Sequence, residues 1–189
     1  MAKALILIDY TYDFVADDGK LTAGAPAQAI SETICHVTQL AYDQGDYIFF
    51  AIDAHDPDDT FHPEARLFPP HNIIGTSGRE LFGPLADFYQ QHRDDSRVFW
   101  MDKRHYSAFS GTDLDIRLRE RHVDTVILTG VLTDICVLHT AIDAYNLGYR
   151  IEVVEPATAA LTQESHQFAL NHFKGTLGAT LVNEDLQEF

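Results

Sequence analysis

The chain has 189 residues, of which 46% are hydrophobic and 22% charged, a composition typical of a globular protein with a proper hydrophobic core. Its 13 basic and 29 acidic residues give a formal net charge of −16. Nucleic acids and anionic membrane surfaces both attract basic proteins, so we expect neither as a partner. No apolar run is long enough to span a bilayer, and the first residues lack the pattern of a cleavable signal, so we expect a cytoplasmic protein.

Apolar runs typical of strands alternate with helical patterns along the chain. The predicted strands cover residues 4–8, 47–52, 97–100, 125–129, 151–154 and 179–182. Apolar residues at helical spacing occur within residues 30–41, 135–145 and 168–173. Most strand runs are continuously apolar, which indicates burial on both faces. The pattern predicts one domain over residues 1–189 of the α/β class, a three-layer α/β/α sandwich around a mostly parallel, doubly wound six-stranded sheet.

Chemically active residue types follow several of these strands. Asp9 follows the first strand, Lys103 lies at the end of the third, and Cys136 begins the helix after the fourth. The carboxyl ends of parallel strands share one edge of the sheet, so these side chains should meet there. A helix start is expected to lower the thiol pKa of Cys136, a carboxylate can accept its proton, and a lysine can hold that carboxylate. Cys35 lies in the middle of a predicted helix, and we expect only a structural role for it.

An irregular segment rich in Asp, His and Pro extends from residue 53 to residue 78. Long irregular segments inside compact domains are usually functional or disordered, and the histidines favour function. Its candidate metal ligands are Asp53, His55, Glu64 and His71. Carboxylate and imidazole ligands together suit zinc, iron(II) or manganese with positions left open for water or substrate. His62 competes with Glu64 for one ligand position.

The motifs around these residues resemble those of the isochorismatase-like cysteine hydrolases, and among them the nicotinamidases. The resemblance extends over essentially the whole chain. It rests on residues 7–14, 53–55, 69–76, 102–109 and 130–136. It implies a catalytic triad of Asp9, Lys103 and Cys136 and a metal site of Asp53, His55 and His71, with Glu64 in the ligand position that varies. The Pro69-Pro70-His71 run resembles nicotinamidases more than their acid-processing relatives, which commonly lack the metal.

The resemblance also implies how a substrate would be held. A cis peptide bond between Val131 and Leu132 would align the backbone N–H groups of Leu132 and Cys136 on the substrate carbonyl, which forms the oxyanion site. The rings of Phe14, Phe68 and Tyr106 would enclose the pyridine ring of the substrate.

The activity that the resemblance implies is hydrolysis of nicotinamide to nicotinate and ammonia through a thioester, as part of NAD salvage. Pyrazinamide should also be accepted, zinc is the expected metal, and the family often assembles as homodimers or tetramers. One alternative is a related hydrolase of N-carbamoyl or ureido compounds, with Arg104 holding a substrate carboxylate. A second alternative is a metal-holding binding protein without turnover, because a fold alone does not determine function.

Overall fold

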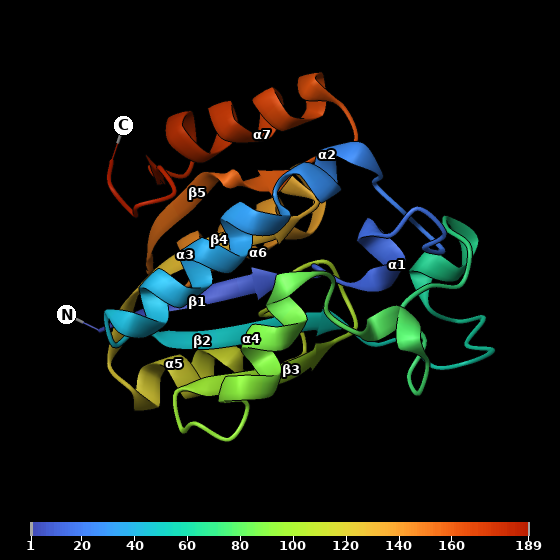
Figure 1. The fold of residues 1–189 in the computed structure, drawn as a ribbon. Coiled ribbons are helices and arrows are strands. Elements are labelled where there is room, and N and C mark those ends of the chain that lie inside the picture. The colour runs from blue at the N-terminus through green and yellow to red at the C-terminus, as the bar shows by residue number, and fades with distance from the viewer. Residues whose placement is uncertain (1, 189) are drawn as a thin grey trace.

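The computed structural model describes residues 2–188 and contains one six-stranded sheet (Figure 1). Its strands are β1 (Ala2–Ile8), β2 (Tyr47–Asp53), β3 (Val98–Lys103), β4 (Val123–Val131), β5 (Arg150–Ala159) and β6 (Thr180–Val182). The strand order is β3-β2-β1-β4-β5-β6, and every neighbouring pair is parallel. The predicted fold class is confirmed, and the sheet is wholly rather than mostly parallel. The strand order reverses between β1 and β4, the place where such sheets bind ligands.

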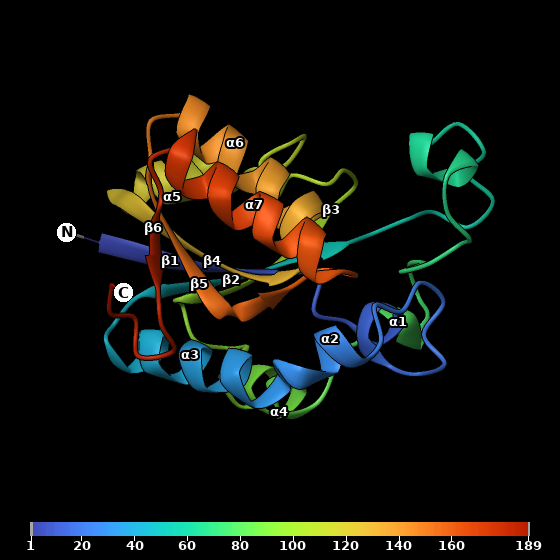
Figure 2. The ribbon, with the colours of Figure 1, turned by 90° about the horizontal axis from the view of Figure 1, so that it is seen from above.

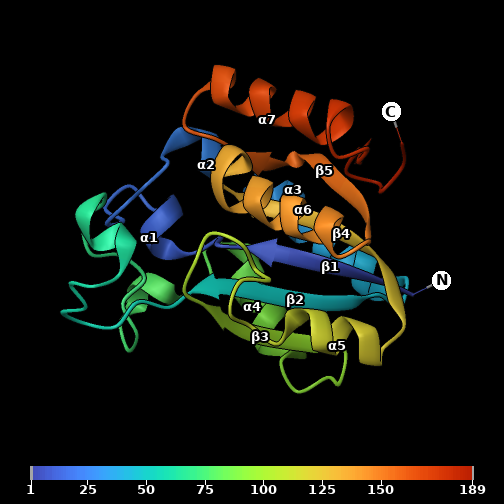
Figure 3. The same cartoon turned by 180° about the vertical axis from the view of Figure 1, so that it is seen from behind.

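Helices cover both faces of the sheet, which confirms the three-layer sandwich. One face carries α2 (Ala25–Ala29), α3 (Ser31–Asp43) and α4 (Pro84–His92), as Figure 2 shows. The other face carries α5 (Leu114–Glu120), α6 (Leu138–Asn146) and α7 (Gln163–Gly175), and Figure 3 views the molecule from that side. Among residues 2–188, no helix combines the length and apolar character needed to cross a membrane. That residues 1–189 form a single domain stays a prediction, and the two end residues lie outside the described part.

Alternate side chains of each central strand belong to different hydrophobic clusters. In β1, Ala4, Ile6 and Ile8 pack toward α5, α6 and α7, whereas Leu5 and Leu7 pack toward α3 and α4. All five are almost completely buried. Burying a large aliphatic side chain contributes about 1.5–3 kcal/mol to stability. Because both faces of the strand are buried, apolar residues are favoured at every position, and the strand lacks the alternation of apolar and polar residues seen when one face is exposed to solvent.

Two aromatic residues of the predicted helical patterns do not pack inward. Tyr145 of α6 is 54% exposed and Phe168 of α7 is 62% exposed. In α7 the buried side is formed by Ala169, Leu170 and Phe173 instead. Successive residues of a helix are rotated by about 100°, so Phe168 points away although it is next to Ala169 in sequence.

The irregular segment after β2 lies beside α1 (Tyr12–Val15), at the end of the sheet toward which the strands point (Figure 1). It contains only two short 3-10 turns, η1 (Pro63–Arg66) and η2 (Ser77–Arg79). Backbone hydrogen bonds from His55 N–H to the Asn72 carbonyl (3.2 Å) and from Ile74 N–H to the His55 carbonyl (2.9 Å) join its two branches. These bonds bring His55 close to the residues around His71.

Candidate active site

A buried lysine joins the ends of β1, β2 and β3. The Lys103 Nζ lies 2.7 Å from Asp9 Oδ2 and 2.5 Å from Asp53 Oδ1, and all three side chains are buried. The Lys103 Nζ also donates to the His105 carbonyl (3.2 Å), and the Asp53 N–H donates to Asp9 Oδ1 (2.8 Å). Buried charges persist only when paired and hydrogen bonded to this extent.

The two carboxyl groups of this network differ in acidity. Burial raises the pKa of Asp9 to about 7, and the charge of Asp53 acts in the same direction. Burial also opposes ionisation of Asp53, but the charge of Lys103, followed by the nearby His55 imidazole, lowers the pKa of Asp53 to about 2. Asp53 therefore stays ionised, while Asp9 can gain or lose a proton near neutral pH.

Cys136 lies in η3 (Thr133–Val137), a π-helical turn between β4 and α6. Its sulfur and carboxylate oxygens of Asp9 and Asp53 all lie within 4.8 Å of one another. Burial raises the pKa of the Cys136 thiol well above its ordinary value, and both carboxylates add to this effect against the opposing charge of Lys103. The lowered pKa expected from the helix start is thus wrong. A neutral thiol beside Asp9 needs that carboxylate as a base before it can attack.

The turn before Cys136 depends on a glycine. Gly130 has φ +108°, and a Cβ atom there would lie 2.0 Å from the carbonyl oxygen of Ile8 in β1. The peptide bond between Val131 and Leu132 is cis, at the position that the resemblance implied.

Two threonines that sequence reasoning missed hold this turn in place. Thr140 Oγ1 donates to the Cys136 carbonyl (2.8 Å) and accepts from the Ala108 N–H (3.0 Å). Thr133 Oγ1 lies 2.9 Å from His166 Nδ1 of α7. Threonines are common in strands and helices, so Thr140 gave no signal in the sequence, whereas Thr133 lies in one of the resembling motifs.

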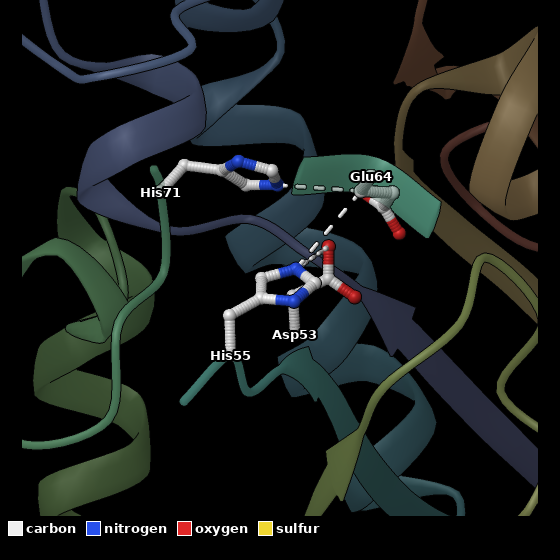
Figure 4. Close-up of side chains that lie close together, drawn as sticks. All are labelled: Asp53, His55, Glu64 and His71. Carbon is white, nitrogen blue, oxygen red and sulfur yellow. Dashed lines mark ion pairs between the residues drawn. The ribbon is translucent and has the colours of Figure 1, made fainter. Parts of the chain in front are cut away.

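Four potential metal ligands converge beside this network (Figure 4). They are Asp53, His55, Glu64 and His71, all buried, with one ligating atom each within 4.8 Å of the others. Glu64 Oε2 lies 3.5 Å from His71 Nε2 and 3.9 Å from His55 Nε2, and His55 Nε2 lies 3.8 Å from Asp53 Oδ2. Ligands bound at 2.0–2.2 Å to one ion lie about 3–4 Å apart, so these spacings fit a single divalent cation.

The histidines of this group present free ring nitrogens. His71 Nδ1 donates to the Pro69 carbonyl (2.9 Å), which leaves the lone pair on Nε2. Within the described residues, His55 Nε2 and His71 Nε2 are buried without a hydrogen-bond partner. Buried polar atoms are rarely left unpaired, and a backbone carbonyl behind the ring is the usual support of a metal-binding histidine. The donor set therefore fits a divalent cation.

Asp53 belongs to both groups. Its Oδ1 contacts Lys103, and its Oδ2 faces His55. One carboxylate thus connects the metal-type ligands with the residues around Cys136.

His62, the competing ligand, lies outside the group because both of its ring nitrogens have other partners. Its Nδ1 accepts the Glu64 N–H (3.3 Å), and its Nε2 lies 2.5 Å from the Arg104 carbonyl oxygen. The geometry therefore groups Glu64, and not His62, with the other candidate ligands.

Two of the three predicted ring contacts, Phe14 and Phe68, pack near His71, and the third does not. The ring of Phe14 lies 5.3 Å from that of His71, and the ring of Phe68 lies 6.2 Å from it. Tyr106 packs instead against His139 of α6, with ring centroids 5.2 Å apart. Their contact with a substrate ring stays a prediction.

The guanidinium group of Arg104 is occupied by carboxylates of the chain itself. It forms ion pairs with Asp56 and with Asp59, the latter at 2.8 Å. The alternative function, hydrolysis of N-carbamoyl or ureido compounds, depended on Arg104 holding a substrate carboxylate. A substrate carboxylate would have to compete with these two ion pairs.

Asp13 is a buried residue of the site to which sequence reasoning gave no role, although it lies in one of the resembling motifs. Its Oδ2 accepts the Asn72 N–H (2.8 Å) and its Oδ1 accepts the Lys20 N–H (3.2 Å). A Cβ atom at Gly78 would lie 2.1 Å from Asp13 Oδ2, so the carboxylate fills that space. Asp13 thereby fixes the residue next to His71.

Comparison with known proteins gives the family of the chain. Residues 3–185 match the isochorismatase domain. The chain belongs to the isochorismatase family. The crystal structure of a pyrazinamidase/nicotinamidase from Streptococcus mutans is 78% identical and superposes with a TM-score of 0.95, covering 96% of this chain and 100% of that one. An uncharacterized isochorismatase family protein of Bacillus subtilis is 55% identical over 182 residues, 96% of this chain and 100% of that protein.

Other members of the isochorismatase family differ in the reactions for which they are named. A Pyrococcus horikoshii pyrazinamidase, solved in complex with zinc, is 26% identical with a TM-score of 0.82, covering 97% of this chain and 99% of its own. An N-carbamoylsarcosine amidase from Thermoplasma acidophilum is 31% identical with a TM-score of 0.84, and each chain is covered completely. The shared fold does not separate these activities, so the side chains of the site must do so.

Proposed function

We propose that this protein is a metal-dependent nicotinamidase that hydrolyses nicotinamide to nicotinate and ammonia and so serves NAD salvage. The observation that carries the proposal is the buried set of four metal-type ligands that shares Asp53 with the Asp9, Lys103 and Cys136 network. The 78% identity to a pyrazinamidase/nicotinamidase supports the same substrate class.

The metal would be held by Asp53, His55, Glu64 and His71. Zinc is the first choice, in line with the zinc complex of the Pyrococcus relative, and iron or manganese would also suit these ligands. When bound, the cation supplies a Lewis acid that anchors the ring nitrogen of the substrate. Pyrazinamide has a ring nitrogen in the same position, so we expect it to be hydrolysed as well.

The first half of the reaction forms a thioester and releases ammonia. Asp9 accepts the proton of the Cys136 thiol while the sulfur bonds to the carboxamide carbon. The carbonyl electron pair moves to oxygen, where the backbone N–H groups of Leu132 and Cys136 stabilise the negative charge. Asp9 then gives the proton to the amide nitrogen, and the C–N bond breaks. Lys103 remains charged throughout and balances the changing charge of Asp9.

The second half releases nicotinate. Water attacks the thioester carbon and gives a proton to Asp9, the C–S bond breaks, and the Cys136 sulfur recovers its proton from Asp9. The rings of Phe14, Phe68 and Tyr106 would hold the pyridine ring in place. We also propose a cytoplasmic homo-oligomer, a dimer or a tetramer, which light scattering after size-exclusion chromatography tests.

The decisive experiment measures ammonia released from nicotinamide. We expect turnover by the zinc-loaded protein, none after chelation, and none by Cys136→Ala, because the thioester forms on the Cys136 sulfur. Cys35→Ala is the matched control and should keep full activity, since Cys35 is half-buried in α3 away from the strand ends. If the zinc-loaded protein ignores nicotinamide but hydrolyses N-carbamoyl or ureido compounds, the substrate assignment is wrong. If it turns over none of them, the protein is a metal-holding binding protein.

A further inference from the structure

The side chain of His62 joins the backbone of Glu64 to the backbone of the residue after Lys103. Its Nδ1 accepts the Glu64 N–H (3.3 Å), so the ring proton lies on Nε2. That nitrogen donates to the carbonyl oxygen of Arg104 at 2.5 Å. One imidazole thus connects the loop of a metal-type ligand with the end of β3.

Arg104 adds a second connection between the same two segments. Its guanidinium group forms ion pairs with Asp56 and with Asp59 (2.8 Å). Asp59 Oδ1 in turn accepts the N–H groups of Phe61 (2.9 Å) and His62 (3.2 Å). The contacts therefore lead from Arg104 through Asp59 to His62, and from the His62 ring back to Arg104.

The His62 ring also packs against the rings of His55 (centroids 4.8 Å apart) and His105 (5.4 Å), but apolar packing contributes little to this part of the chain. Among the described residues, none from 56 to 67 belongs to either hydrophobic cluster. Phe61 is 93% exposed and Leu67 is 64% exposed, and the only regular structure is the four-residue turn η1. A segment without apolar anchoring loses its order easily, and a ligand on it must be ordered when the metal binds.

We propose that His62 and Arg104 form a latch of positioning residues that keeps Glu64 in place and thereby sets the affinity of the site for its metal. The inference rests on the metal site of the proposed function. The His62 ring bonds to the carbonyl of Arg104, the residue next to Lys103. The same contact therefore helps to position both Glu64 and the lysine of the candidate triad. Neither latch residue belongs to the group of four metal-type ligands.

The test measures zinc affinity by calorimetric titration of the metal-free protein in competition with a chelator of known affinity. We expect Arg104→Ala to bind zinc about tenfold more weakly, the range found when supporting residues of metal ligands are removed. Arg104→Lys should lose less, because an ammonium group can pair with only one of the two carboxylates well. His62→Asn should also weaken binding, since asparagine can still accept the Glu64 N–H but cannot reach the Arg104 carbonyl.

The control variant is Arg117→Ala, which removes another exposed arginine with a carboxylate partner (Asp113, 2.7 Å) far from the site, on α5. It should leave zinc affinity unchanged. A merely structural effect is separated by a double-mutant cycle: in a Glu64→Gln background, Arg104→Ala should cause no further loss, because the latch acts through Glu64.

Two results would contradict the latch. In the first, Arg104→Ala and His62→Asn bind zinc as tightly as the unchanged protein. In the second, Arg104→Ala lowers zinc affinity by the same factor in the Glu64→Gln background as it does alone. If the unchanged protein binds no zinc, iron(II) or manganese(II), the proposed metal site is wrong, and so is the latch that depends on it. Binding by the unchanged protein with unaltered affinity in the variants rejects the latch alone.

Discussion

At Gly130 the absence of a side chain decides whether β4 can pass the end of β1. We expect Gly130→Ala to lower the free energy of unfolding by more than about 4 kcal/mol, because the new methyl group would overlap the Ile8 carbonyl at 2.0 Å in addition to the cost of φ +108°. Urea unfolding followed by circular dichroism measures the loss, and a failure to fold would agree with it.

Gly148 provides the control for this substitution. It has φ +82° but open space around its Cβ position, so Gly148→Ala should cost only the 1–2 kcal/mol or so of a left-handed conformation. Equal losses at the two positions would show that the contact with Ile8 is unimportant.

At the scale of residues, the sequence predicted which side chains meet but not how they behave. Asp9, Lys103 and Cys136 could be grouped because parallel strands place their carboxyl ends at one edge. The raised pKa of Cys136 could not be foreseen, since it is the balance of burial, two carboxylates and one lysine in three dimensions. That the His62 ring points away from the candidate ligands likewise depends on the carbonyl of Arg104, a residue far away in the sequence that follows β3.

At the scale of elements, α1 and the segment around His71 are joined by the carboxylate of Asp13. We expect Asp13→Ala to leave the buried Asn72 N–H without an acceptor, which costs about 1–3 kcal/mol of stability. Because Asn72 follows His71, zinc affinity should also fall, by about tenfold. Urea unfolding of the metal-free protein and zinc titration measure the two effects.

The comparison variant for Asp13 is Asp17→Ala, which removes an exposed carboxylate that accepts from the Gln28 side chain (2.8 Å). Stability and zinc affinity should stay within the error of the unchanged protein. Zinc affinity unaffected in Asp13→Ala despite a lower stability would mean that Asn72 does not position His71.

The elements themselves were predictable where the apolar pattern was long. All six strands and the helices α3, α6 and α7 match predicted segments. The helices α1, α2 and α5 have only four to seven residues, too few for a clear helical period, and α4 contains just two fully packed apolar residues, Leu85 and Phe88. The irregular segment was recognised by its composition, but its path depends on backbone bonds between His55 and the residues around Asn72, which no local pattern encodes.

At the scale of the whole molecule, the metal-type ligands come from both the sheet and the irregular segment. Asp53 ends β2, whereas Glu64 and His71 belong to the segment after it, so one cation would cross-link chain parts that few apolar contacts hold together. The chain is also strongly acidic, with a formal net charge of −16. A cation at this site therefore both satisfies unpaired histidine nitrogens and reduces repulsion between buried carboxylates.

Metal removal should consequently lower the thermal stability of the entire protein. A cation present at about 100 times its dissociation constant stabilises the folded state by about 2.7 kcal/mol, because the unfolded chain lacks the assembled site. For a domain of this size we expect the midpoint of thermal unfolding to fall by about 5–10 °C after chelation and to return with added zinc, as measured by differential scanning calorimetry. Glu64→Gln, which weakens one ligand, should show a smaller difference between the zinc-loaded and chelated samples. An identical midpoint with and without zinc in the unchanged protein would mean that the four side chains hold no metal, whatever their spacing.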